Sequence, residues 1–392
     1  MPLSGIRVVD LTRVLAGPFC SMLLADMGAE VIKIEIPGEG DTVRRAGVIR
    51  DGISWYFAAF NRNKRSLTLN LRHEEGREVL AKLIANSEVL VENFRPGVLA
   101  RMGFDETRLK ALNPGLVYGN ITGFGETGPY RDRPSFDFIA QAMSGLMSVT
   151  GEKDGLPFRA GPPIADLLAG LYGALGICAA LLAREKSGRG EKVGANLLSS
   201  TISILGFFAA NYFATGEAPE RTGNDHAIVA PYGLFRTKDG AVALAPAQEA
   251  TYQRLLDALQ LPQLREDPDF RTNALRLKNR EKINRIVGAR LLMETSDYWI
   301  ARLNAANVPC GQVKNLAEVF ADPQVEDQEM AIEADHPGHG KVRMLGFPLK
   351  FRDRPCRVRL PAPDLGGDTE AVLEEIGYSA PEIARLKEKG IV

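Results

Sequence analysis

The sequence predicts an α/β protein, with a Rossmann-like large domain built on a mainly parallel sheet and a smaller α+β domain. Through the first third of the chain, short apolar strands alternate with short helices, a pattern typical of parallel sheets with right-handed crossovers. A polar linker containing proline and glycine then leads into a mostly helical segment. The length of 392 residues is sufficient for about two domains, each with its own core.

The strands of the large domain are expected where β-branched and other apolar residues run between polar loops. These predicted strands are residues 6–11, 29–35, 65–72, 88–94 and 115–121. Between them we expect a helix at 19–27, for which Pro18 suits the first turn, and an amphipathic helix at 73–87.

Two later segments, 160–183 and 202–214, are apolar enough to raise the question of a membrane span. The first contains Asp166 and four glycines, and the second contains Asn211. We interpret both as helices buried between protein surfaces, because glycine and alanine on several faces allow close packing. An interface between two copies of the chain would supply that burial, so we expect a homodimer and no membrane partner.

The rest of the chain is expected to form the smaller domain and then return to the larger one. We expect a hairpin within 231–247, helices over 250–305, strands near 342–351 and a terminal helix at 368–387. The predicted division is 1–216 for the first part of the large domain, 217–320 for the linker and small domain, and 321–392 for the return.

Composition excludes several classes of function. The formal net charge is −1 with both signs interspersed, so no bulk field favours nucleic acid or an anionic membrane. The four cysteines, Cys20, Cys178, Cys310 and Cys356, fit no metal or redox spacing. Together with an N-terminus that lacks the signal-peptide pattern, they lead us to expect a cytoplasmic protein.

Two familiar kinds of motif are weak here. GFGETG at 123–128 matches GxGxxG, but prolines at 129 and 134 follow it, where a dinucleotide site needs a helix to begin. The four histidines are His73, His226, His336 and His339. HPGH at 336–339 has no cysteine or carboxylate at ligand spacing, so we favour a turn or surface role over a metal site. No Ser-His-Asp arrangement can be assembled.

Asp166 is the most informative residue, because it is the only charged residue between Arg159 and Arg184. A carboxylate in an apolar segment is costly unless something offsets its desolvation. A helix N-terminus can do so, and we expect Asp166 to be ionised, oriented and poorly hydrated, as a nucleophile requires. The alternative is that Asp166 only caps its helix.

The segment VENFRPG at 91–97 places an amide, an aromatic ring and a guanidinium where a strand ends. Open α/β sheets bind ligands at this carboxyl edge. Basic residues that could bind phosphates there are Arg13, Lys33, Arg72, Arg95 and Arg101. The alternative for these residues is an ordinary solvated surface.

Taken together, these segments resemble the family III CoA-transferases, which include formyl-CoA transferase and α-methylacyl-CoA racemase. The resemblance covers essentially the whole chain. Its motifs are GIRVVDLTRVLAGP, GAEVIKIE, FNRNKRSLTLNL, VENFRPG, GFGETGPY, FDFIAQAMSGLMSVTG, IADLLAGLYGALGICAALLAREKSGRGEKV, RTGNDHAIVAPYGLF, NVPCGQV and LGFPLKF. It implies interlocked, ring-like dimers and an acyl-CoA thioester as substrate, with no permanently bound cofactor and no metal.

The resemblance also assigns site residues. The family's nucleophilic aspartate falls on Asp166. Positions that contact CoA or line the site fall on Leu15, Ala16, Leu69 to Arg72, Asn93, Phe94, Arg95, Arg101, Met102, Phe136 and Asp137. Candidate substrate-contacting residues are Tyr56, His226 and Tyr232, the last two within or beside the 223–233 loop.

Three departures from the family pattern bear on specificity. Ile36 stands where formyl-CoA transferase has an arginine, and GNDHAIVAPYG at 223–233 replaces its Gly-run loop. Phe136 stands where the racemase branch has a catalytic histidine, so transferase is favoured over racemase. The sequences of the FDFIAQ and IADLLAG segments most resemble those of the branch that uses succinyl-CoA as donor to dicarboxylic acids.

The expected reaction is CoA transfer from an acyl-CoA to a carboxylic acid through an aspartyl anhydride and an aspartyl–CoA thioester. Every nucleophile is already anionic, so no histidine base or metal is required. The alternatives are an α-methylacyl-CoA racemase or isomerase, and a non-catalytic acyl-CoA-binding protein.

Overall fold

The computed structural model describes residues 1–392, which form two compact units. The larger unit comprises residues 1–146, 160–207 and 323–392, and the smaller unit comprises 147–159 and 208–322. The predicted division placed 147–159 and 208–216 in the large domain, whereas in the structure both segments belong to the smaller unit.

The larger unit is built on a six-stranded sheet in which every neighbouring pair is parallel. Its strands are β1 (Arg7–Asp10), β2 (Glu30–Glu35), β5 (Lys64–Thr68), β6 (Val89–Glu92), β7 (Val117–Thr122) and β8 (Lys192–Asn196). Their spatial order is β5-β2-β1-β6-β7-β8. The direction of winding therefore reverses between β1 and β6, as in a doubly wound Rossmann-like sheet. This confirms the predicted parallel sheet.

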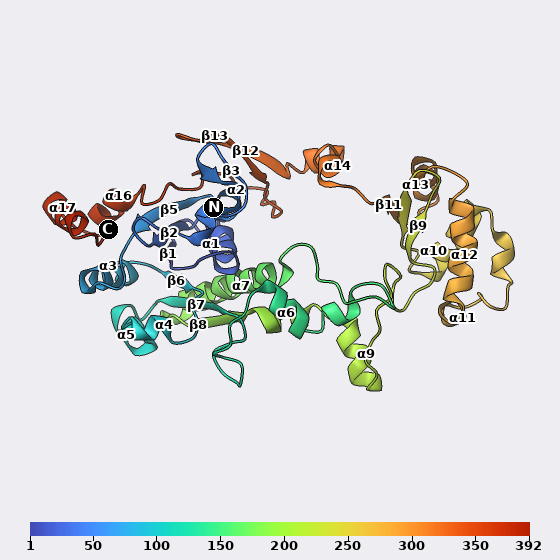
Figure 1. The fold of residues 1–392 in the computed structure, drawn as a ribbon, viewed down its shortest axis with the longest axis horizontal. Helices are drawn as coiled ribbons and strands as arrows, with labels where there is room; N and C mark the ends of the chain where they lie inside the picture. The colour runs from blue at the N-terminus through green and yellow to red at the C-terminus, as the bar shows by residue number, and fades with distance from the viewer. The chain divides into compact units, whose positions relative to one another are not determined.

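Helices cover both faces of this sheet (Figure 1). The helices α1 (Ala16–Asp26) and α7 (Ile164–Ser187) share a core with Val8 and Val91 on one face. On the other face, Val9 packs with α3 (Glu74–Ala85), α5 (Glu106–Leu112), α16 (Thr369–Glu375) and α17 (Ala380–Glu388). The opposite directions of Val8 and Val9 are the period-two alternation of a strand covered on both faces.

The helix α7 lies unusually close to α1. A Cβ on Gly170 would lie 2.5 Å from the carbonyl oxygen of Ala16, so only glycine fits there. The helix is long and apolar enough to cross a membrane, but one side of it packs on α1, β7 and β8 as a core helix of the larger unit. Leu175 on the other side is 63% exposed in the single chain, so the expected burial of this side between protein surfaces requires a second copy of the chain.

The second apolar segment is not one helix. It covers the end of α8 (Leu197–Ser203) and most of α9 (Phe207–Thr215), with a break between the two helices. No residue of α9 is buried in the single chain, so its expected burial between protein surfaces stays a prediction. The strand β8, which precedes α8, was not predicted, because KVGAN follows a charged turn and contains a glycine.

The chain returns to the larger unit through α15 (Pro323–Asp327) and the hairpin β12 (Ala331–His336) with β13 (Gly340–Leu345). The single terminal helix predicted over 368–387 is wrong. Gly377, at φ +84°, follows α16, and Ser379 starts α17 through a capping box with Glu382.

The smaller unit has a three-stranded antiparallel sheet in the order β11-β10-β9. Its elements are β9 (Gly233–Arg236), β10 (Ala241–Leu244), α10 (Glu249–Leu259), α11 (Asn273–Lys278), α12 (Arg280–Leu291), α13 (Ser296–Ala305), β11 (Cys310–Gln312) and α14 (Leu316–Phe320). The hairpin and the helices agree with the predicted pattern. Tyr252, Val287 and Trp299 lie at the centre of its core.

Candidate active site

Two neighbouring hollows lie at the carboxyl edge of the parallel sheet, where the winding reverses. The first has a volume of about 230 Å³ and the second about 400 Å³. The loops that follow β1 and β6 contribute to both hollows, and Arg13 and Phe94 line both of them. We call the first the Asp166 cavity and the second the outer cavity. This position is where doubly wound folds bind their ligands.

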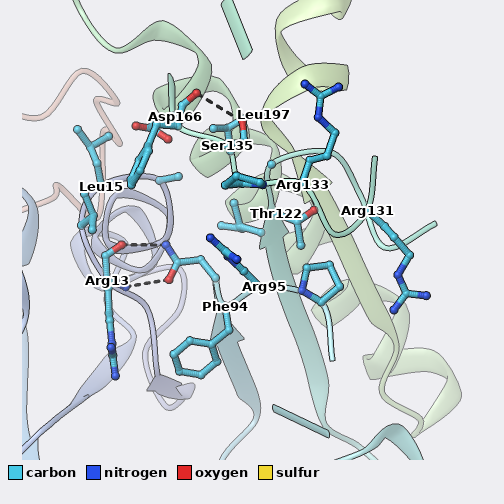
Figure 2. A pocket seen from close by; sticks show the side chains of 18 residues that line it. Arg13, Leu15, Phe94, Arg95, Thr122, Arg131, Arg133, Ser135, Asp166 and Leu197 are labelled. Carbon is cyan, nitrogen blue, oxygen red and sulfur yellow. Dashed lines mark hydrogen bonds between the residues drawn. The ribbon is translucent and has the colours of Figure 1, made fainter. Parts of the chain in front are cut away.

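Asp166 lies in the first turn of α7 and lines its cavity, as Figure 2 shows. Its side chain is largely buried, and no protein group donates a hydrogen bond to its carboxylate. Burial, with a smaller effect from the neighbouring charge of Asp137, raises the pKa of Asp166 to about 7. With a pKa near 7, Asp166 is ionised in about half of the molecules at neutral pH, where the sequence led us to expect an ionised carboxylate.

Asp137 lies at the start of α6 (Asp137–Met143) and is buried. Its Oδ1 accepts the N–H of Ala165 at 2.8 Å, and its Oδ2 accepts a hydrogen bond from Gln141 Nε2 at 2.7 Å. Asp137 thus holds the first turn of α7 instead of lining the cavity. Its neighbour Phe136 does line the cavity and is 71% exposed as a residue.

The predicted contact residues divide between the two hollows. The Asp166 cavity is lined by Leu15, Ala16, Asn93, Phe94, Arg95 and Phe136. The outer cavity is lined by Leu69, Arg72, Phe94 and Met102. In Figure 2 Arg95 extends into the space between the surrounding loops. The amide of Asn93 is already engaged, since Oδ1 accepts the Arg13 N–H at 2.9 Å and Nδ2 donates to the Arg13 carbonyl at 2.8 Å.

The outer cavity combines an apolar floor with basic groups. Leu69 and Met102 belong to the floor, and Arg13 and Arg72 supply guanidinium groups. The Arg13 guanidinium carbon lies 5.5 Å from the centre of the Phe94 ring. This combination suits a ligand that carries both a flat ring and phosphates. Ile36 also lines this cavity.

Several other predicted residues lie outside both cavities. Arg101, the last residue of α4 (Val98–Arg101), is exposed and lines neither cavity. Lys33, proposed from sequence as a phosphate ligand, is fully buried and paired with Asp41 at 3.1 Å, so that interpretation is wrong. Tyr56 in α2 (Trp55–Asn61) is half-buried. Burial, together with the nearby charges of Asp166 and Asp41, raises the pKa of Tyr56.

His226 and Tyr232 belong to the smaller unit. Their rings contact each other, with centroids 4.6 Å apart, and the His226 N–H donates to the Tyr232 carbonyl at 2.9 Å. Burial and the charge of Arg280 lower the pKa of His226.

The HPGH segment contacts a carboxylate, that of Asp364, which its sequence spacing did not reveal. His339 Nε2 lies 3.0 Å from the carboxylate of Asp364, and the rings of His336 and His339 contact each other. These three residues are close enough to hold a metal ion. However, both ring nitrogens of His336 already bond to the carbonyl groups of Pro337 and Ala362. These bonds fix His336 at the turn between β12 and β13, and the expected turn role of this segment stays a prediction.

Other residues of the Asp166 cavity were not named from sequence. They are Val14, Pro96, Ile121, Thr122, Gly123, Arg131, Arg133, Pro134, Ser135 and Leu197. Many follow β7, so the strand order β1-β6-β7 would have indicated them. In Figure 2 the guanidinium groups of Arg131 and Arg133 extend outward.

Comparison with known proteins decides the family. The sequence matches the profile of CoA-transferase family III over residues 3–369. The chain belongs to CoA-transferase family III. It is 40% identical over 401 residues to an "Acyl-CoA transferase" of Fusarium pseudograminearum, covering 100% of this chain and 88% of that protein.

Two further likenesses have similar extent. Over 393 residues the chain is 38% identical to the "Succinyl-CoA:glutarate CoA-transferase" of Mus musculus, covering 100% of this chain and 90% of that protein. Its structure resembles the crystal structure of a CAIB/BAIF family protein from Brucella suis with a TM-score of 0.85 and 38% identity, over 96% of this chain and 99% of that one.

This family III protein is therefore an enzyme, a CoA-transferase. The site suits transfer better than racemisation. Phe136 presents an apolar ring to the Asp166 cavity where proton exchange at a carbon would need a second acid or base. A carboxylate with no protein donor bound to it is, in contrast, available for attack on a carbonyl carbon.

Proposed function

We propose that the protein transfers CoA from a dicarboxylic acyl-CoA, such as succinyl-CoA, to a carboxylic acid, with Asp166 as the nucleophile. The observation that carries this proposal is Asp166 itself, a largely buried carboxylate without a protein hydrogen-bond donor in a cavity at the switch point. The murine relative named for succinyl-CoA and glutarate supports the choice of donor.

The transfer proceeds by exchange at carbonyl carbons. The Asp166 carboxylate attacks the thioester carbonyl, the C–S bond breaks, and an acyl–aspartyl anhydride and CoA thiolate form. The thiolate attacks the aspartyl carbonyl and displaces the donor carboxylate, which leaves an aspartyl–CoA thioester. The acceptor carboxylate then repeats the sequence in reverse, so that the acceptor leaves as its CoA thioester and the Asp166 carboxylate is restored. No proton is consumed overall.

The two cavities bind different parts of the acyl-CoA. The outer cavity, with Leu69, Arg72 and Met102, takes the nucleotide end of CoA, and Phe94 stands where the two cavities meet. The pantetheine arm then passes the wall formed by Leu15 and Ala16 to reach Asp166. The small volume beside Asp166 limits the access of water to the anhydrides.

The raised pKa of Asp166 has a role in this scheme. A carboxylate with a pKa near 7 is a stronger nucleophile than one with an ordinary pKa, and it is still ionised in a useful fraction at neutral pH. A raised pKa also makes the Asp166 carboxylate a poorer leaving group from the anhydride, closer to the CoA thiolate. The anhydride and the aspartyl–CoA thioester are then closer in free energy, so neither accumulates at the expense of turnover.

We also propose that the chain works as a homodimer. Many large apolar side chains of the larger unit are exposed in the single chain, among them Phe138, Ile139, Leu171, Leu175, Leu182, Ile202 and Ile204. A surface of this kind marks an interface, and a second copy would cover α7. Light scattering after size exclusion tests this proposal, and a monomer would contradict it. All four cysteines are free, which supports a reducing, cytoplasmic location.

The function is tested by offering a panel of carboxylic acids with succinyl-CoA and with acetyl-CoA, and by identifying the new thioesters by mass. We expect dicarboxylic acids to accept CoA from succinyl-CoA, and Asp166→Asn to abolish the exchange. Asp132→Asn, on the exposed loop after β7, is the matched control and should retain it. Transfer that survives in Asp166→Asn would eliminate the nucleophile. Deuterium incorporation at the α-carbon without transfer would indicate a racemase instead.

A further inference from the structure

The loop of residues 12–14, between β1 and α1, is held almost entirely by side chains. Lys33 Nζ donates to the Thr12 carbonyl at 2.8 Å, and Asp10 accepts the Thr12 N–H at 2.8 Å. Asn93 bonds to both the N–H and the carbonyl of Arg13. Asp41 accepts the Val14 N–H, with both carboxylate oxygens at 3.2 Å. No backbone–backbone hydrogen bond within the loop takes their place.

Val14 has a backbone conformation that a valine rarely adopts. Its φ is +69°, in the left-handed region, where a β-branched side chain is a genuine outlier. Such a conformation persists only where the surroundings enforce it, and these outliers concentrate at functional sites. The residues that follow, Leu15 and Ala16, form the wall of the cavity that contains Asp166.

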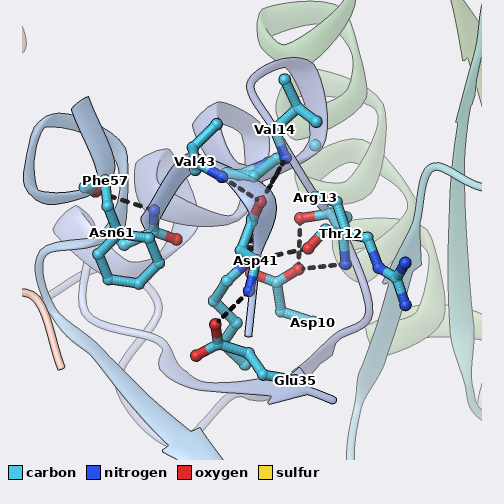
Figure 3. Close-up of polar contacts among 12 residues, drawn as sticks. Asp10, Thr12, Arg13, Val14, Glu35, Asp41, Val43, Phe57 and Asn61 are labelled. Atoms are coloured by element: carbon cyan, nitrogen blue, oxygen red, sulfur yellow. Dashed lines mark hydrogen bonds and ion pairs between the residues drawn. The ribbon is translucent and has the colours of Figure 1, made fainter. Parts of the chain in front are cut away.

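Asp41 is the group that bonds to the backbone of Val14. Figure 3 shows this carboxylate between the N–H of Val14 and the N–H of Val43, the latter in η1 (Thr42–Arg45). Asp41 is buried and paired with the fully buried Lys33 at 3.1 Å. Its own N–H donates to Glu35 at 2.9 Å, and Arg44 holds Glu35 through Nε at 2.8 Å. The carboxylate is therefore fixed from three directions.

Stability alone does not account for this network. Buried ion pairs are generally no more stabilising than well-packed apolar residues, but they fix one geometry. The geometry fixed here is that of a loop lining both cavities. We infer that Asp41, supported by Lys33, is a positioning residue of the transfer reaction: by holding Val14 in its left-handed conformation it keeps the Leu15–Ala16 wall facing Asp166. This inference rests on the proposed function of Asp166.

The test compares Asp41→Ala with Asp41→Asn, which keeps an oxygen for the Val14 N–H. We expect kcat/KM for CoA transfer to fall about tenfold or more in Asp41→Ala, because small displacements of a wall beside the reacting atoms slow the reaction. In Asp41→Asn we expect at least half of this loss, on a logarithmic scale, to be recovered. Asp26→Ala is the matched control. Asp26 is also buried and paired, with Arg62 at 2.7 Å, but it lines neither cavity. This variant should lose stability while its kcat/KM stays within about twofold.

A double-mutant cycle with Val14→Gly separates positioning from general stability. Glycine adopts positive φ freely, so the loop would no longer depend on Asp41. We expect Asp41→Ala to cost less than about threefold in kcat/KM in the Val14→Gly background. Because Asp41→Ala leaves the Lys33 ammonium without its carboxylate, Asp41→Ala/Lys33→Met is prepared as well. We expect at least the same loss from it, since Lys33 also holds the Thr12 carbonyl.

Two results would overturn the inference. One is a folded Asp41→Ala or Asp41→Ala/Lys33→Met protein with kcat/KM within twofold of the wild type. The other is an equal cost of Asp41→Ala in the valine and glycine backgrounds. Either result would leave the proposed nucleophile untouched, since that depends on Asp166→Asn. Transfer by Asp166→Asn would instead remove the proposed function, whatever Asp41 does.

Discussion

The Oδ1 atom of Asp137 accepts the backbone N–H of Ala165 at 2.8 Å, which places a second carboxylate beside Asp166 at the start of α7. The contact satisfies one of the free amides of the helix N-terminus. It also places a negative charge near the nucleophile, where it raises the pKa of Asp166 in addition to the larger effect of burial. Asp137 therefore both fixes the first turn of α7 and raises the pKa of Asp166.

The first prediction concerns the pH dependence of the reaction. Asp166 must be ionised to attack, and its pKa is raised to about 7, so kcat/KM for the acyl-CoA should rise with pH and level off above about 8. Initial rates between pH 5 and 9 measure this profile. A profile that is flat down to pH 5 would show that Asp166 has an ordinary pKa.

Asp137→Asn should move the midpoint of that profile to lower pH. The variant removes the negative charge near Asp166 but keeps an oxygen for the Ala165 N–H. Because burial of Asp166 is the larger effect, the pKa of Asp166 should remain above its ordinary value. A midpoint that stays in place, in a folded variant, would show that Asp137 is only structural.

Asp166→Asn should make the protein more stable at alkaline pH while abolishing transfer. The folded state holds a proton on Asp166 at a pH where the unfolded chain has released it, so the contribution of Asp166 to the free energy of unfolding falls as pH rises from about 4 to 7. The gain from Asp166→Asn should be on the order of 4 kcal/mol at pH 8 and small near pH 4. Chemical denaturation at both values measures it, and an equal effect at the two pH values would contradict the raised pKa.

Two arginines should differ in their effect on acyl-CoA binding. Arg72→Ala removes a guanidinium that lines the outer cavity and should raise KM for the acyl-CoA by about tenfold, with a smaller change in kcat. Arg101, which the family resemblance also assigns to CoA, lines neither cavity, so Arg101→Ala is the matched control and should leave KM within about twofold. Equal increases in the two variants would place the nucleotide between α4 and the outer cavity.

Gly170→Ala should disturb both the fold and the site. A Cβ at this position would lie 2.5 Å from the carbonyl oxygen of Ala16, a backbone atom that cannot move without shifting α1 or α7. We expect a loss of about 1–3 kcal/mol in the free energy of unfolding, together with reduced transfer. Gly161→Ala, which has nothing within 4 Å of the added atom, is the control.

The parallel sheet could be predicted because apolar strands alternate with short helices along the first third of the chain, and the opposite faces of Val8 and Val9 agree with it. It did not predict β8, whose short glycine-containing stretch becomes a strand only by pairing with β7. The break at Gly377 was also missed, since the apolar pattern continues across it.

The nucleophile could be proposed from sequence because an isolated charge in an apolar helix is visible there. The partners of that charge could not. Asp137 and Ala165 are 28 residues apart, and Lys33 was taken for a phosphate ligand because nothing in the sequence shows that Asp41 folds onto it. Asn93 was assigned to CoA, yet its amide bonds to the backbone of Arg13, 80 residues earlier. Such contacts depend on the strand order, which spacing along the chain does not reveal.

The most direct test of the account is to trap the covalent intermediate. The enzyme is incubated with succinyl-CoA without an acceptor, quenched with acid, digested and examined by mass spectrometry, with Asp166→Asn treated in parallel. We predict a CoA adduct on the peptide that contains Asp166, and its loss when a dicarboxylic acid is added before the quench. An adduct on another residue, or rapid transfer without any adduct on Asp166, would contradict the central claim.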